Sequence, residues 1–402
     1  DVIWEIIPDL IFEVEEAQDA GQILATKSID GLICINGTFA LGHLILEINK
    51  WIRVPILLWG LEELPHKGGK IRLNSTCGLN LNASNLYKAG IRNYHYCIGG
   101  EIDKDWLDAI RILKTFSTAR VGIIGSRARG FFNVDVDELD LYKQLGVLID
   151  YYQLEELLNM GIENVEIEKR IEELKANFDI SELNDQQLRK VAELIVRLDE
   201  FMKVKSLTSM AIRCWPEFAE YYGISPCAAM SVLQAEGKIL TCEGDILGSL
   251  SMLAHVAIGG QYPFLADFSQ VDFKENFALL WHCGVAPCNL WDQKCTRSLD
   301  TYFAGGKGVT AGFVLKSGDL SILRLDYSPP NEYRIFLQQG KSIPIAKELK
   351  GTFAKVVFKE DVRNVLNKII KNGIAHHVSV VYGDFIKPLE IFAKLKGWKV
   401  IK

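Results

Sequence analysis

Short apolar runs alternate with helical stretches through residues 1–145, and this alternation limits the possible folds more than any other feature of the chain. Strands that alternate with helices form a parallel sheet covered by helices. Ligands of such sheets bind outside the carboxyl ends of the strands, where Asn36, Trp59 and Ser126 fall. The buried strands expected here are residues 31–36, 54–59, 94–99 and 119–125.

The pattern changes twice after residue 145. A new strand begins near 145–149, and residues 153–204 are rich in Glu, Lys, Leu and Ile at the spacing of two amphipathic helices. From about residue 271, short β runs separated by turns are typical of an antiparallel barrel or sandwich. We therefore predict an α/β protein with two Rossmann-like parallel-sheet domains and a β-rich, barrel-like C-terminal domain, divided as 1–145, 146–270 and 271–402.

Charge and cysteine usage exclude several functional classes. The chain has 45 Lys+Arg against 51 Asp+Glu, so nothing indicates a nucleic-acid partner. No run approaches the ~18–20 apolar residues of a membrane span, and no secretory signal is visible. The 9 cysteines form no CxxC pair, so we expect reduced thiols in a cytoplasmic protein. A zinc site at Cys283, Cys288 and Cys295 is the alternative, although this spacing matches no zinc-finger pattern.

Carboxylates and imidazoles within apolar segments indicate where the chemistry lies. Glu243, Asp267, His282 and the pair His376-His377 each lie in or beside an apolar run, at the expected end of an element. A buried carboxylate is costly unless it is paired or bound to a metal. Oxygen and imidazole ligands without thiolate suit Mn²⁺, Mg²⁺ or Co²⁺. The competing interpretation is that Asp267 caps a turn and Glu243 belongs to a structural ion pair.

Two further features qualify this site. If His376 and His377 lie on one strand, their imidazoles point to opposite faces, so at most one faces a given site. Phosphate-loop and GxSxG motifs are absent. Arg127, which follows the expected strand at 119–125, has the position of an anion contact, although an arginine of this kind more often belongs to a solvated loop.

Segments from both halves of the chain together resemble the L-fucose isomerase and L-arabinose isomerase superfamily. The resemblance covers nearly the whole chain, although the C-terminal domain is shorter than in the family's well-known members. The segments that carry it are 36–38, 55–60, 122–127, 225–234, 242–245, 259–267, 282–284 and 375–377.

The resemblance implies a metal-dependent aldose–ketose isomerase that acts on an open-chain sugar through an enediol intermediate. In that family a Glu, a second carboxylate and a late His bind Mn²⁺, which correspond here to Glu243, Asp267 and His377. Aspartate as the second carboxylate is typical of fucose isomerases, whereas a further His, at the position of His282, is typical of arabinose isomerases. Glu243 and Asp267 would also act as acid and base.

The resemblance also implies a homo-oligomer, a hexamer or trimer, in which a neighbouring subunit contributes substrate contacts. Asn36, Trp59, Arg127 and His376 are the candidate substrate-binding residues.

Three alternatives stay open. The superfamily includes isomerases of modified sugars such as sulfoquinovose, and a sulfonate would need a cation such as Arg129 or Arg213. A non-catalytic sugar-binding relative would not need Glu243, Asp267 and a late His. A metal-dependent epimerase or aldolase would use the same ligands.

Overall fold

The computed structural model describes residues 2–328, 330 and 332–402, and the chain divides into two compact units. Unit 1 extends to Lys114 and also contains Lys387–Lys399, whereas unit 2 contains Thr115–Ile386 and Val400–Lys402. The first division therefore falls before the expected boundary at residue 145, and a late helical segment groups with unit 1. The three-domain division stays a prediction.

Unit 1 contains a parallel sheet of three strands in the order β1-β2-β3 within the described residues. The central strand is apolar and buried through Ile56, Leu57 and Leu58, as expected for a strand covered on both faces. The strands are β1 (Leu32–Asn36), β2 (Ile56–Gly60) and β3 (Tyr94–Ile98), and the helices are α1 (Val14–Ala25), α2 (Leu44–Trp51), α3 (Ser75–Lys88), α4 (Lys104–Ser117) and α12 (Ile386–Lys396).

Unit 2 begins with a second parallel sheet, in the order β5-β4-β6-β7. The strand at 119–125 was expected in the first sheet, but β4 hydrogen-bonds to β5 and β6. The alternating pattern identified the strand and carried no information on which sheet it joins. The strands are β4 (Arg120–Ile124), β5 (Leu148–Tyr152), β6 (Ser209–Ile212) and β7 (Leu240–Cys242), and the helices are α5 (Glu138–Leu145), α6 (Leu154–Leu158), α7 (Asn164–Asn177), α8 (Asp185–Val204), α9 (Cys227–Ala235) and α10 (Ile246–Ala257).

The remaining strands form a mixed sheet that closes on itself. Within the described part of the chain, β14, β9, β8, β15, β12 and β13 each pair antiparallel with the next, and β13 pairs with β14 to complete the ring. The predicted barrel-like domain, and with it the predicted fold class, is confirmed. The strands are β8 (Phe264–Asp272), β9 (Phe277–His282), β10 (Ser298–Phe303), β11 (Gly308–Val314), β12 (Gly318–Ser328), β13 (Glu332–Ile343), β14 (Thr352–Phe358), β15 (His377–Tyr382) and β16 (Lys399–Ile401).

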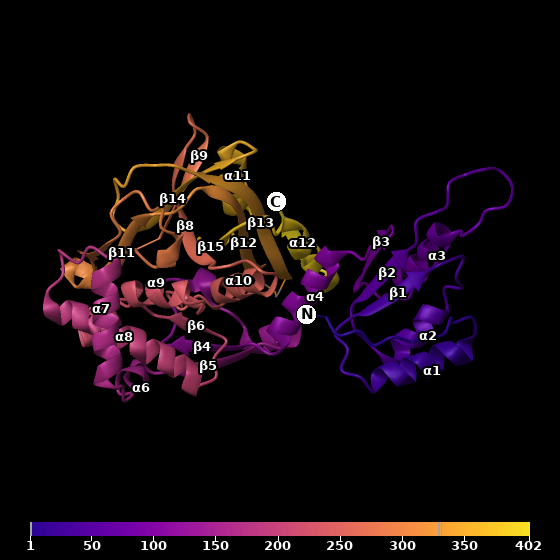
Figure 1. Cartoon of the computed structure of the whole chain (residues 1–402), viewed down its shortest axis with the longest axis horizontal. Helices are drawn as coiled ribbons and strands as arrows, with labels where there is room; N and C mark the ends of the chain where they lie inside the picture. Colours follow the sequence, from indigo (N-terminus) through magenta and orange to yellow (C-terminus); the bar gives the residue numbers. More distant parts are fainter. Residues whose placement is uncertain (1, 329, 331) are drawn as a thin grey trace. The chain divides into compact units, whose positions relative to one another are not determined.

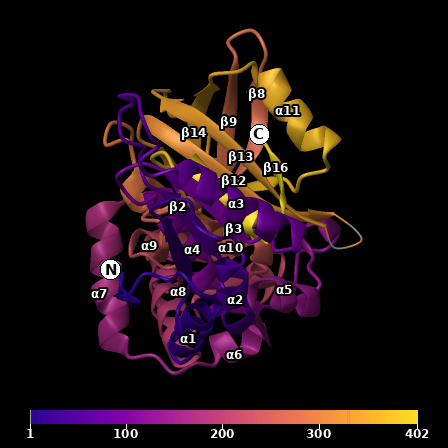
Figure 2. The ribbon, with the colours of Figure 1, turned by 90° about the vertical axis from the view of Figure 1, so that its right-hand side faces the viewer.

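Two apolar helices join the layers of unit 2. Helices α9 and α10 lie between the four-stranded sheet and the barrel (Figure 1), and α10 contacts β6, β7, β12 and β15. Helix α10 is buried from Ile246 through His255, which suits a helix covered on all sides. Helix α11 (Val362–Lys371) lies beside the tip of the β8–β9 hairpin in both ribbon views (Figures 1 and 2), where Arg363 stacks over Phe273.

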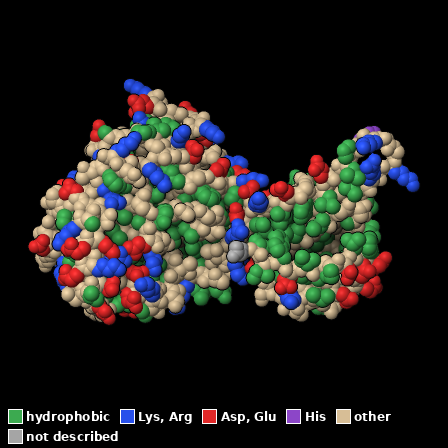
Figure 3. Space-filling model, viewed as in Figure 1, with side chains coloured by type: hydrophobic (Ala, Val, Ile, Leu, Met, Phe, Trp, Pro, Cys, Tyr) green, Lys and Arg blue, Asp and Glu red, His purple; other side chains and the backbone are tan. Residues whose placement is uncertain are grey.

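Charges of both signs are intermixed on the visible face of unit 2. Around α7 and α8, blue and red side chains alternate (Figure 3), and Arg189 pairs there with Glu168 and Glu193. This mixture agrees with the near balance of acidic and basic residues. None of the helices in the described residues is long and apolar enough to cross a membrane.

Candidate metal centre

The turn after β7 positions Glu243. The backbone of Glu243 adopts φ 65° and that of Gly244 φ 74°, and Asp245 then caps α10 by accepting a hydrogen bond from the Gly248 N–H at 2.8 Å. A Cβ on Gly244 would lie 2.7 Å from the Cα of Arg127, so only glycine fits this turn. Left-handed backbone at a glutamate is costly, and such strain is concentrated at functional sites.

Neighbouring barrel strands bring the other candidates to the same place. Asp267 on β8 pairs directly with His377 on β15 and, on its other side, with Trp281 on β9. His282, the last residue of β9, stacks its ring on His377 with 5.5 Å between centroids. The barrel therefore places Asp267, His282 and His377 side by side, facing the carboxyl end of β7.

His377 is the centre of this cluster. Its Nε2 atom lies 3.2 Å from Glu243 Oε2 and 3.7 Å from Asp267 Oδ1, and its Nδ1 atom lies 2.9 Å from Asp245 Oδ2. Burial lowers the pKa of His377, but hydrogen bonds to Asp245 and Glu243 outweigh burial and raise it to about 10. The favoured member of the histidine pair thus reaches both predicted carboxylate ligands.

A buried ion pair orients His377. Asp245 and Arg324 are both fully buried, and the Arg324 guanidinium donates to Asp245 Oδ2, the atom that also accepts from His377. Burial alone would raise the pKa of Asp245, but Arg324 and His377 hold it well below its ordinary value. A carboxylate that binds Nδ1–H leaves Nε2 of the ring free for a cation, which is the usual arrangement behind a metal-bound histidine.

Besides His377, aromatic and amide side chains lie around the Glu243 carboxylate. His376 Nε2 lies 3.4 Å from Glu243 Oε2, and Trp215 Nε1 donates to Glu243 Oε1 at 3.4 Å. The His376 ring meets Phe131 edge-on, and its Nδ1 lies 3.1 Å from Asn133 Nδ2. Burial alone would raise the pKa of Glu243, but hydrogen bonds from His376 and His377 hold it well below its ordinary value.

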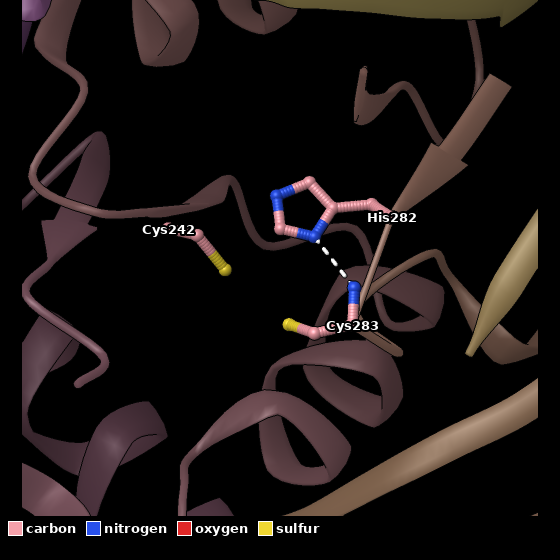
Figure 4. Close-up of side chains that lie close together, drawn as sticks. All are labelled: Cys242, His282 and Cys283. Carbon is pink, nitrogen blue, oxygen red and sulfur yellow. Dashed lines mark hydrogen bonds between the residues drawn. The ribbon is translucent and has the colours of Figure 1, made fainter. Parts of the chain in front are cut away.

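The backbone sets the tautomer of His282. The Cys283 N–H donates to His282 Nδ1 at 2.9 Å (Figure 4), so a neutral ring carries its hydrogen on Nε2. Burial lowers the pKa of His282, which favours this neutral form. His282 is therefore better suited to donating a hydrogen bond to Asp267 than to binding a metal ion. Its predicted role as a metal ligand stays a prediction.

The donor set fits a divalent cation. Asp267 Oδ1 and His282 Nε2 are buried without a hydrogen-bond partner among the described residues. Among the described residues, three groups offer ligand atoms that lie within 4.8 Å of one another, and two of them share His377: Glu243-His376-His377 and Asp267-His282-His377. Carboxylate oxygens and imidazole nitrogens suit Mn²⁺, Co²⁺ or Mg²⁺.

The stability of the metal-free protein is expected to fall as pH rises from 7 to 10. The pKa of His377 is raised from an ordinary 6.5 to about 10, so its contribution is complete below about 6.5 and is lost as pH rises through about 10. Urea unfolding in chelator at pH 7, 8.5 and 10 measures this loss. His377→Gln should flatten the decline, and parallel curves for the two proteins would contradict the pairing of His377 with Asp245 and Glu243.

Three predicted substrate contacts are engaged in other interactions. Asn36 is buried in unit 1, where it bonds to Asn82 and to the Cys34 carbonyl, and Trp59 Nε1 donates to the Gly99 carbonyl at 2.9 Å. Arg127 Nε donates to Asp135 at 2.8 Å. Their substrate contacts stay predictions.

The cysteine trio weighed for zinc is not brought together. Cys283 Sγ lies 3.3 Å from Cys227 Sγ, whereas Cys295 Sγ accepts from the Val314 N–H. Metal-binding groups found among the described residues include neither Cys288 nor Cys295. Cys283, the residue after β9, lies instead beside Cys227 at the start of α9 and Cys242 at the end of β7.

Sequence reasoning missed Arg324, Trp215 and the role of Asp245. One signal was present: Arg324 interrupts the apolar run Leu320–Leu325, and a charge at the centre of a buried strand requires a partner. The partner itself, 79 positions away, was not visible without the fold.

Comparison with known proteins bears on the chemistry. No family model matches the chain. The chain is 27% identical over 390 residues to a sulfoquinovose isomerase of Priestia megaterium, covering 94% of this chain and 87% of that protein. Proteins of the same name from Alkalicoccus urumqiensis and Clostridium sp. are each 25% identical, over 93% and 88% of this chain. The chain is an enzyme of the isomerase class, an intramolecular oxidoreductase, as the sequence predicted.

Proposed function

We propose that the chain isomerises an open-chain sulfonated aldose, sulfoquinovose, to the corresponding ketose. The observation that carries this proposal is the convergence of Glu243, Asp267 and His377 in a chain whose relatives are named sulfoquinovose isomerase. This substrate replaces a fucose- or arabinose-type sugar as the favoured one. Manganese, a homo-oligomeric state and a cytoplasmic location stay predictions.

Glu243, Asp267 and His377 would hold the divalent cation. When bound, such a cation acts as a Lewis acid toward the sugar oxygens and makes the neighbouring carbon-bound proton easier to remove. Glu243 is suited to holding positive charge, because its low pKa keeps it ionised. Asp245 and Arg324 contribute by fixing the ring of His377.

Asp267 is the proposed base. Its Oδ1 atom is buried without a hydrogen-bond partner among the described residues, so it can accept a proton without first breaking a hydrogen bond. Glu243 is a weaker candidate, because Trp215 and His376 already donate hydrogen bonds to its ionised form. The Nε2–H of His282 faces the same group and can stabilise the charge on Asp267 or on a sugar oxygen.

Arg213 is the proposed contact for the sulfonate. It follows β6 at the edge of the sheet from which Glu243 also extends, and its guanidinium bonds to Ser126 Oγ at 3.3 Å and to Glu217 at 2.5 Å. Its Nε has no partner among the residues that the structure describes. A guanidinium has donors spaced for two oxygens of one anionic group, which suits a sulfonate.

Arg213→Met is expected to raise KM for sulfoquinovose by ~10–100-fold, because a charge-assisted hydrogen bond contributes ~1.5–3 kcal/mol. Turnover of glucose, which lacks the sulfonate, should change little. Arg129→Met is the matched comparison, since Arg129 is the other candidate cation and is exposed. Equal losses on both sugars, or a selective loss in Arg129→Met alone, would reject the assignment of Arg213.

A further inference from the structure

Four buried thiols lie beside the candidate metal centre and take no part in the proposed reaction. Cys214, Cys227, Cys242 and Cys283 are each at most 4% exposed. They come from four different segments: the loop after β6, the first turn of α9, the end of β7 and the residue after β9. The fold therefore brings together cysteines that are distant in sequence.

The thiols contact one another. Cys227 Sγ and Cys283 Sγ are 3.3 Å apart, and hydrogen bonds from Cys242 and Cys283 hold the pKa of the Cys227 thiol well below its ordinary value. In Figure 4 the side chains of Cys242 and Cys283 point toward each other beside the His282 ring, and donor atoms of these three residues lie within 4.8 Å of one another.

We propose that Cys227, Cys242 and Cys283 contribute thiolate ligands to a second metal site, for a thiophilic cation of the zinc class. This site goes beyond the proposed function, because it would bind a structural ion and contact no sugar. Binding displaces the three thiol protons to solvent and involves no change of oxidation state.

The sulfur spacing favours a metal over a disulfide. Zinc–sulfur bonds of about 2.3 Å in a tetrahedron place sulfurs about 3.8 Å apart. The 3.3 Å between Cys227 and Cys283 is much closer to this value than to the ~2.05 Å of a disulfide. Cys227 is also the first residue of α9, where the positive end of the helix dipole favours a thiolate.

Such an ion would hold both segments that carry the candidate active site. Cys242 immediately precedes Glu243, whose backbone has φ 65°, and Cys283 immediately follows His282 and fixes its tautomer. Ligation of both cysteines would oppose relaxation of the strained Glu243 turn. The bound ion is therefore expected to hold the backbone of Glu243 and His282 in position without contacting the sugar.

Growth of the expressing cells in medium with Co²⁺ in place of Zn²⁺ tests this proposal, because ions then load while the chain folds. The purified protein should show an intense near-ultraviolet sulfur-to-cobalt charge-transfer band. Cys227→Ser should abolish that band, and Cys288→Ser, a half-buried cysteine outside the group, should keep it. Glu243→Gln should also keep it, which separates this site from the sugar site.

X-ray absorption of the wild-type cobalt protein provides a readout that needs no variant. Three or four sulfur ligands per thiol-bound ion would support the site even if Cys227→Ser does not fold. A folded wild-type protein without a charge-transfer band or cobalt–sulfur ligation would overturn it. A band that disappears in Glu243→Gln would overturn it as well, and neither result would alter the proposed isomerase activity.

Discussion

Glu243→Gln is expected to lower kcat/KM by on the order of 10³-fold or more and to remove the catalytic cation. The substitution keeps the size of the side chain but removes the negative charge that faces His376 and His377. Loss of one anionic ligand costs several kcal/mol of charge stabilisation, and each 1.36 kcal/mol corresponds to a tenfold change in rate. Steady-state kinetics and metal content by mass spectrometry measure the two effects.

Glu275→Gln is the matched control for this change. Glu275 is an exposed carboxylate whose contact is an ion pair with Lys355 at 2.8 Å. Its substitution should leave both rate and metal content unchanged. If Glu243→Gln kept full metal content and wild-type turnover, Glu243 would not be a ligand and the proposed centre would be wrong.

Arg324→Met is expected to destabilise the protein by about 3–5 kcal/mol, because it leaves the buried Asp245 carboxylate without its cation. The accompanying loss of activity should exceed the loss of folded protein, since Asp245 also orients His377. Urea unfolding gives the first quantity, and kcat of the folded fraction gives the second.

Two comparisons isolate the cause of this destabilisation. The double variant Arg324→Met/Asp245→Asn should recover part of the lost stability, since it no longer buries an unpaired charge. Arg120→Met, which breaks a half-buried pair with Asp150 at the protein surface, should cost less than about 1 kcal/mol. A loss of under 1 kcal/mol in Arg324→Met would show that Asp245 and Arg324 do not form the buried pair described above.

Most strands of the barrel and of both parallel sheets could be predicted because their apolar runs are short and separated by turns. Strands β7 and β8 were not predicted: β7 has three residues, and in β8 Asp267 interrupts the apolar segment. Sheet membership was not predictable for β4, because pairing depends on tertiary contacts that the alternation of strands and helices does not specify.

For the site, the sequence supplied the ligand candidates but not the groups that orient them. Glu243, Asp267 and His377 were identified from apolar surroundings and from the resemblance, and the fold brings their side chains together. The tautomer of His282 depends on one backbone N–H, and the orientation of His377 depends on Asp245 and Arg324. Such contacts join distant segments and have no local sequence pattern.

The most direct test of the central claim is turnover of sulfoquinovose by the Mn²⁺-loaded protein in deuterated water, followed by NMR. The proposed proton transfer predicts a ketose with solvent deuterium at C1, formed only while the cation is present and lost in Asp267→Asn. A ketose without deuterium at C1, or turnover that persists after chelation, would contradict a metal-dependent enediol mechanism at Glu243, Asp267 and His377.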